Sequence, residues 1–131
     1  METISVRTSG RTSFTDITRD IAAVISREGW QDGLLAVYTP HTTSAITINE
    51  NADPDVQTDM NSFLSKLIPV VPEFRHSEGN SDSHLKSSLV GCSETVIVEN
   101  GQMVLGTWQG IYFCEFDGPR TRKVFLKFIG K

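Results

Sequence analysis

The sequence predicts a single α+β domain with an antiparallel, β-sandwich-like core and two to three helices. Short alternating or continuous apolar segments recur along the chain, as in strands. Two longer segments carry apolar residues at helical spacing. The last third alternates strand-like segments with the turn signals Asn100-Gly101 and Asp117–Arg120. The 131 residues fit one domain spanning 1–131.

The first third of the chain predicts a strand followed by a helix. Glu2–Thr8 alternates, with Ile4 and Val6 facing inward. The helix is expected from about Phe14 to Glu28, with Ser13 or Thr15 as its cap. Gly29 ends it, and its apolar stripe is Ile17, Ile21, Val24 and Ile25.

Two strands and a second helix follow. Leu34–Tyr38 and Ser44–Asn49 are strand segments separated by a turn at Pro40. Asp53 and Pro54 are typical of a helix start, and the helix is expected to run to about Leu67. Its buried residues are expected to be Val56, Met60, Phe63, Leu64 and Leu67.

The segment Pro69–Ser83 has no clear element and carries many polar side chains. Loops of this length inside a domain are often functional. A short helix over His84–Cys92 is expected next, with its apolar residues Leu85, Leu89 and Val90 facing inward.

The last third predicts two hairpins. Thr95–Val98 and Gln102–Leu105 flank Asn100-Gly101. In the second, a two-residue loop at Gly118-Pro119 joins the strands Gly110–Phe116 and Arg122–Phe128. This register places Glu115 opposite Arg122 and Asp117 opposite Arg120. The Glu115–Arg122 pair is then either a structural ion pair or a wall of a pocket.

Composition excludes several classes of protein. The net charge is −4, with no long basic run, which argues against nucleic-acid binding. No apolar stretch has the length of a membrane span, and no secretory signal is recognised, so a cytoplasmic location is expected. Cys92 and Cys114 are expected to be buried thiols in a reducing compartment.

The candidate site centres on the only three histidines, His41, His76 and His84, which all lie among small polar residues. Three imidazoles suit a zinc ion with one open position. Without a metal, they can bind phosphate and move protons. Both alternatives stand at this point.

Three further features of the sequence are candidates for binding or catalysis. Asn49 begins an oxygen-rich strand end of the kind that magnesium favours. Trp108 lies between two nearby glycines and can stack on a ligand ring. Asp82 or Glu115 can orient a histidine or handle a proton.

Several of these blocks together resemble the YjbQ family, whose members are often named secondary thiamine-phosphate synthase enzymes. The resemblance runs over nearly the whole chain, with the blocks in the family's order. They are His41–Ala45, Asn49-Glu50, Asp53–Val56, His76–His84, Leu105–Ile111 and Glu115–Arg120.

The resemblance implies a cytoplasmic homotrimer whose polar blocks converge on a pocket near a subunit boundary. The implied reaction joins a pyrimidine diphosphate to a thiazole phosphate and releases pyrophosphate. The alternative is a non-catalytic trimeric module that binds a phosphorylated metabolite or a metal.

Residues and resemblance together give a set of expected roles. The expected catalytic residues are His41, His76, His84, Glu115 and Asp82, the histidines also being candidate ligands of a zinc or magnesium ion. The expected substrate-binding residues are Thr43, Ser44, Asn49, Asn80, Trp108, Gln109, Arg120 and Arg122.

Overall fold

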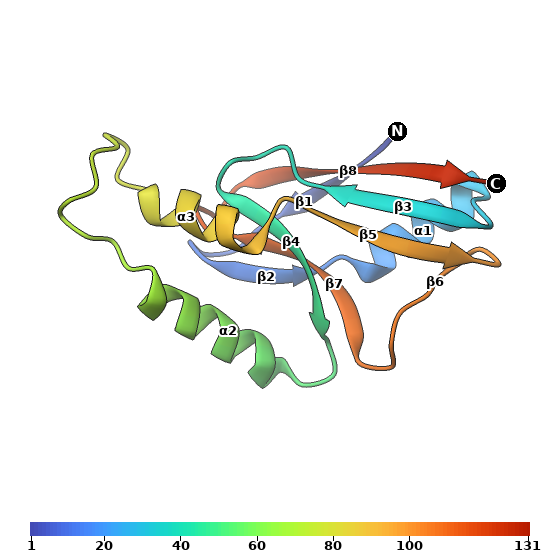
Figure 1. The fold of residues 1–131 in the computed structure, drawn as a ribbon, viewed down its shortest axis with the longest axis horizontal. Coiled ribbons are helices and arrows are strands. Elements are labelled where there is room, and N and C mark those ends of the chain that lie inside the picture. The colour runs from blue at the N-terminus through green and yellow to red at the C-terminus, as the bar shows by residue number, and fades with distance from the viewer.

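Two antiparallel sheets and three helices make up the computed structural model, which describes all 131 residues (Figure 1). The larger sheet contains, in spatial order, β1 (Glu2–Arg7), β8 (Thr121–Gly130), β3 (Gly33–Tyr38), β5 (Ser93–Glu99) and β6 (Gln102–Met103). The smaller sheet contains β2 (Ser13–Asp16), β7 (Gln109–Glu115) and β4 (Ser44–Glu50). The predicted α+β class with an antiparallel core is confirmed.

The core lies between the two sheets and helix α1 (Thr18–Glu28). Alternate residues of the strands point into it, among them Ile4 and Val6 on β1, as predicted. The fully buried Phe113 of β7 and Val124 of β8 belong to the same cluster. Both sheets therefore bury one face against the other.

The predicted hairpin between β7 and β8 is wrong, because these strands belong to different sheets. β7 pairs with β2 and β4, and β8 pairs with β1 and β3. Residues 8–11 hold the connection, since the Gly118 N–H donates to the Arg11 carbonyl and the Thr8 N–H to the Arg120 carbonyl. The apolar residues expected to share one face, Ile111, Phe113, Val124 and Leu126, do belong to one core cluster, but they reach it from two different sheets.

Helix α1 starts later than predicted. Ser13–Asp16 pairs with β7 as a strand, so neither Ser13 nor Thr15 is a helix cap. Asp16 Oδ1 instead accepts from the backbone N–H of Thr18 at 2.9 Å, which satisfies one of the free donors of the first turn. Gly29 ends the helix with a φ of +67°, as predicted.

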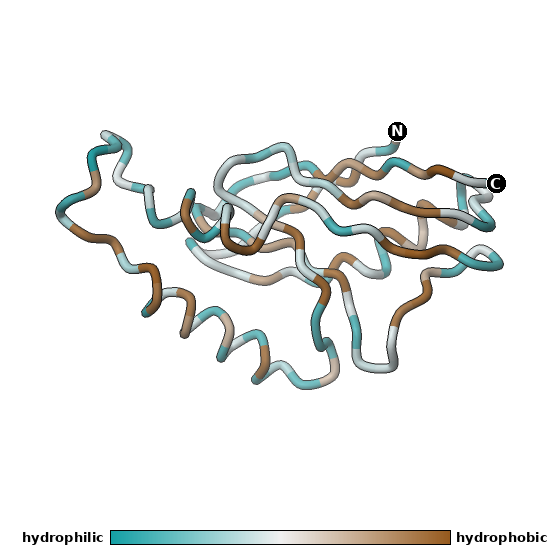
Figure 2. Tube along the Cα trace, in the orientation of Figure 1, coloured by the Kyte–Doolittle hydropathy of each residue, from teal (hydrophilic) through white to brown (hydrophobic).

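Helix α2 (Pro54–Leu67) has the predicted bounds and the predicted cap, with Asp53 accepting from the Asp55 N–H. Its predicted burial is wrong. None of its residues is buried, and Phe63 and Leu67 are 65% and 56% exposed. The helix lies along one side of the fold, beyond β2 and α3 in the view of Figure 1, with hydrophobic residues along its length (Figure 2).

Helix α3 (Ser81–Val90) begins three residues before the prediction and packs with the opposite face inward. Its buried residues are Asp82, Ser83, Lys86 and Ser87. Leu85 and Leu89, which were expected to face inward, are 48% and 61% exposed. Val90 is half-buried and packs against the cluster of Ala45, Cys114 and Phe116, as expected. The polar face is stable inside because its groups are hydrogen-bonded: Asp82 to Arg11 and Lys86, and the Ser87 hydroxyl to the Ser44 carbonyl.

Two smaller predictions have different outcomes. The hairpin at Asn100-Gly101 is confirmed, with φ values of +52° and +75° at the two turn residues. Cys114 is buried as predicted, whereas Cys92 is exposed, and both are free thiols. None of the helices is long and apolar enough to cross a membrane.

Candidate functional site

A polar pocket opens where the β3–β4 connection, the start of α3 and the β7–β8 connection meet. Its volume is about 450 Å³, and none of its lining residues is hydrophobic. The lining residues are Pro40, His41, Thr42, Thr43, His76, Glu78, Asn80, His84, Asp117, Arg120 and Arg122. All three histidines therefore reach one pocket from two distant parts of the chain.

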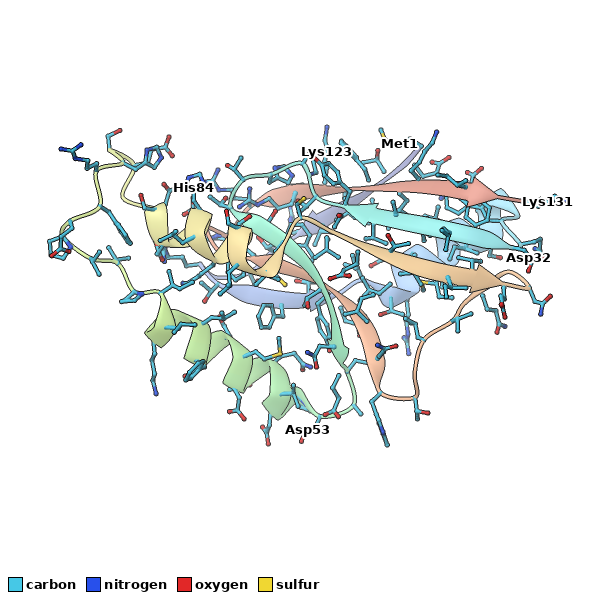
Figure 3. The ribbon with its side chains drawn as sticks, viewed as in Figure 1. Met1, Asp32, Asp53, His84, Lys123 and Lys131 are labelled. Atoms are coloured by element: carbon cyan, nitrogen blue, oxygen red, sulfur yellow. The ribbon has the colours of Figure 1, made fainter.

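His76 and His84 lie edge to face, with their ring centroids 5.3 Å apart and their planes at 78°. His84 is on the first turn of α3, on the opposite half of the molecule from Asp32 and Lys131 (Figure 3). His76 Nε2 is 4.0 Å from the Glu78 carboxylate. The irregular segment before α3 thus folds back and brings the second histidine to the third.

His41 forms a hydrogen bond with β8 beyond the end of its pairing with β3. The β3–β8 pairing stops at Tyr38 and Phe125, so the N–H of Lys123 lies beyond the last ladder pair. His41 Nε2 accepts from this N–H at 2.9 Å. A neutral imidazole whose Nε2 is an acceptor carries its proton on Nδ1.

The protonation of His41 is biased toward the neutral form. Burial lowers its pKa below the ordinary value, and the positive charges of Arg122, Arg120 and Lys123 add to this, against a smaller opposite effect of Glu115. At neutral pH the ring is therefore a neutral hydrogen-bond donor through Nδ1.

The three histidines are not gathered as joint ligands of one metal ion, and the expected zinc or magnesium ion stays a prediction. No group of three or more histidine, cysteine, aspartate or glutamate side chains is arranged to hold a metal ion. Zinc binds the unprotonated nitrogen of a neutral imidazole. In His41 that nitrogen, Nε2, already accepts the Lys123 N–H. Beside the carboxylates of Glu78 and Asp117, the pocket is lined by Arg120 and Arg122, whose donors suit an anion.

Arg122 lines one wall of the pocket and forms a buried ion pair with Glu115. Arg122 Nε donates to Glu115 Oε1 at 2.8 Å, and Nη2 to Oε2 at 2.5 Å. Nη2 also donates to the Thr43 hydroxyl at 2.8 Å. The residue Arg122 is only 4% exposed, and its Nη1 has no partner within the protein. Arg122 lines the pocket, whereas Glu115 lies behind it.

The Glu115 carboxylate is fixed as an anion. Burial alone raises its pKa, but hydrogen bonds from Arg122, from the Thr8 hydroxyl and from the Asp117 N–H, with the charge of Arg122, lower it below the ordinary value. Both oxygens are occupied by these donors. Glu115 therefore positions Arg122, which corrects its expected role as a proton carrier.

Arg120 and Asp117 form a second pair at the mouth of the pocket. Arg120 donates from Nη2 to Asp117 Oδ2 at 3.0 Å and from Nε to the Asp117 carbonyl at 2.8 Å. The same Oδ2 accepts from Asn80 Nδ2 at 2.8 Å. Asn80, the residue before α3, is thereby tied to the β7–β8 connection. Its Oδ1 is buried without a partner in the protein.

Asp82 does not reach the pocket, which corrects its expected role. Arg11 binds both of its carboxylate oxygens at 2.9 and 3.0 Å, and Lys86 Nζ is 3.4 Å from Oδ2. Burial raises the pKa of Asp82, but the bonds and charges of Arg11 and Lys86 outweigh it and lower the pKa. Asp82 therefore anchors α3 to the β1–β2 connection.

Four of the expected substrate-binding residues lie outside the pocket. Ser44 is fully buried, with its hydroxyl 2.7 Å from that of Thr39. Asn49, Trp108 and Gln109 lie at the far ends of β4 and β7. Asn49 follows Ser44 by five positions on β4, which is roughly 17 Å along a strand. Trp108 is 61% exposed there, far from the histidines.

Sequence reasoning missed part of the site. Thr42, Glu78 and Asp117 line the pocket, and Thr8 supports Glu115 from behind. The sequence did offer a signal for Asp117, because that residue was expected to lie opposite Arg120. Thr8 had none, since only the pairing of β1 with β8 brings it to the carboxylate.

Comparisons with known proteins place this geometry in a family. The family model described as "UPF0047 protein YjbQ-like" matches residues 2–131. The chain belongs to the YjbQ family. It is 55% identical to UPF0047 protein MJ1081 of Methanocaldococcus jannaschii, covering 95% of this chain and 91% of the relative. It is 52% identical to UPF0047 protein YugU of Bacillus subtilis, covering 99% of each.

Solved structures share the fold of this YjbQ-family chain. An uncharacterized conserved protein of the YjbQ/UPF0047 family from Clostridium acetobutylicum is 52% identical, with a TM-score of 0.95 over 98% of this chain and 100% of that one. A hypothetical protein from Aeropyrum pernix is 38% identical, with a TM-score of 0.93 over the full length of both chains.

Proposed function

We propose that this YjbQ-family chain binds the phosphate groups of a small phosphorylated substrate in the polar pocket and promotes a group transfer there. The observation that carries this proposal is the Arg122 side chain, which lines the pocket, is buried and held by Glu115, and has no partner for Nη1 within the protein. Guanidinium groups match the geometry of phosphate oxygens. Arg120 and the Nδ1–H of His41 add donors to the same pocket.

Within this class we propose thiamine-phosphate synthase as a secondary activity. In that reaction the thiazole nitrogen forms a bond to the pyrimidine's methylene carbon, the bond from that carbon to the diphosphate oxygen breaks, and negative charge develops on the departing pyrophosphate. Fixed donors that face this charge lower the barrier without reorganising. Neutral His41 donates a hydrogen bond there, and Arg122 and Arg120 supply positive charge. The rate is expected to be modest, because Trp108 does not reach this pocket to stack on a ring.

The same proposal covers assembly and location. We propose a cytoplasmic homotrimer with the pocket near a subunit boundary. A non-catalytic module that binds a phosphorylated metabolite is the alternative, since the donors that hold a departing pyrophosphate also hold a bound phosphate. Elemental analysis of the purified protein tests the separate expectation of zinc or magnesium.

Turnover separates the enzyme from the module. The assay measures thiamine phosphate formed from the pyrimidine diphosphate and the thiazole phosphate, with wild type, His84→Ala and the control Trp108→Ala. An enzyme gives turnover in wild type and Trp108→Ala, with at least a tenfold loss in His84→Ala. Tight binding of pyrophosphate without turnover supports the module. Equal turnover in all three proteins contradicts a reaction in this pocket.

A further inference from the structure

A second cavity adjoins the polar pocket and shares part of its wall. Its volume is about 560 Å³. Four residues line both cavities: Pro40, His41, Thr42 and His84. Two histidines therefore lie on the boundary between two spaces, each within the size range of small-molecule sites.

The two cavities differ in charge. Arg120, Arg122, Asp117 and Glu78 line the polar pocket, whereas the second cavity has no arginine, lysine, aspartate or glutamate in its wall. Its remaining lining residues are Tyr38, Thr39, Ser87, Ser88, Gly91 and Cys92. A charged phosphate group is therefore directed to the first cavity and an uncharged group to the second.

The side-chain groups of the second cavity that have no partner within the protein favour a ligand with a ring. Tyr38 is 42% exposed, and Phe125 stacks against it at 6.3 Å, which holds its ring in place. The Thr39 and Ser87 hydroxyls already bind Ser44. Ser88 is exposed and has no partner within the protein. A flat aromatic face with a free hydroxyl suits an uncharged ring that carries a hydrogen-bonding group.

We propose that the second cavity binds the uncharged, ring-bearing part of a phosphate ester whose phosphate lies in the polar pocket. The inference rests on the proposed function, because it takes the phosphate position as given. The bond that joins the two parts then lies beside His41 and His84. The site is bipartite, and the boundary histidines are next to the reacting atoms.

Cys92 allows the second cavity to be filled without changing the fold. It is exposed in the cavity wall, whereas Cys114 is fully buried and burial raises the pKa of its thiol. A benzyl methanethiosulfonate reagent therefore labels Cys92 alone, as a mixed disulfide that dithiothreitol removes. Cys92→Ser treated with the same reagent is the matched control.

Calorimetric titration with phenyl phosphate and inorganic phosphate tests the inference. We expect wild type to bind phenyl phosphate at least tenfold more tightly than inorganic phosphate, because the ring is buried against Tyr38. Benzyl labelling should remove this difference and leave the affinity for inorganic phosphate within twofold. Dithiothreitol should restore the difference in affinity. Ser88→Phe should weaken the binding of phenyl phosphate and leave that of inorganic phosphate unchanged.

The contrary outcomes are distinct. Equal affinities for the two ligands in wild type, or an equal loss for both after labelling, overturn the second cavity as the ring site while phosphate binding stands. No binding of either ligand overturns the proposed function and this inference together.

Discussion

Arg122, which lines the polar pocket, binds Glu115 through Nε and Nη2 and has no partner for Nη1 within the protein. Because Glu115 is 0% exposed and Arg122 4%, neither charge is solvated by bulk water. The pair therefore links the stability of the fold to the position of the donor that faces the ligand.

Glu115→Gln leaves the buried guanidinium of Arg122 without a counter-charge. We expect a loss of about 3–5 kcal/mol in the free energy of unfolding, the usual effect of removing one partner of a buried pair. Urea denaturation measures it. In the double variant Glu115→Leu with Arg122→Met we expect much of the stability to return but pyrophosphate binding to be lost, because the guanidinium is gone. Retained binding in the double variant would remove Arg122 from the ligand site.

Acid should destabilise the fold through Glu115 and Asp82. The folded state lowers the pKa of both carboxylates. Their stabilisation is fully present above the ordinary carboxylic values near pH 4 and is lost as the pH falls through the lowered values. Urea midpoints between pH 7 and pH 2 measure this. Glu115→Gln should show a shallower acid loss than wild type, and parallel curves would contradict the assignment.

His41 should be neutral at pH 7, with its proton on Nδ1. Burial and the nearby arginines lower its pKa, and the Lys123 N–H occupies Nε2. The unfolded chain then binds the proton more readily, so this group's effect on stability improves as the pH rises through the ordinary histidine value near 6.5. Long-range ¹H–¹⁵N correlation spectra report the tautomer directly. A protonated Nε2, or a pKa above the ordinary value, would be inconsistent with this geometry.

The polar inner face of α3 should matter more to stability than its leucines. Asp82→Asn removes the charge that faces Arg11 and the buried Lys86, and we expect a loss of about 3 kcal/mol. Leu89→Ser, on the exposed face of the same helix, should change stability by less than about 0.5 kcal/mol. Thermal unfolding of the two variants makes the comparison, and a larger loss for Leu89→Ser would show that α3 packs with its leucines inward.

The sequence allowed most of the strands to be predicted, because alternation and turn signals are local. The prediction failed where residues distant in sequence determine the packing. The leucines of α3 predict the wrong inward face, since no local signal shows that Arg11 is present to bind Asp82. The pairing of β7 with β4 also depends on contacts remote in sequence.

The sequence predicted which residues line the candidate site better than it predicted where each of them lies. The three histidines, Arg120 and Arg122 stand out as charged or titratable groups in polar blocks, and they do line one pocket. Trp108 belongs to an equally distinctive block but lies at the other end of β7. A distinctive sequence block predicts that its residues have a shared role. Which end of the sheet they reach depends on the direction of the strand that carries them.

Titration of pyrophosphate into the purified protein by calorimetry tests phosphate binding in the polar pocket most directly. We expect binding to wild type, an affinity at least tenfold weaker in His84→Ala and in Arg120→Ala, and an unchanged affinity in Trp108→Ala. Absence of binding to wild type, or equal affinities in all four proteins, would contradict the account.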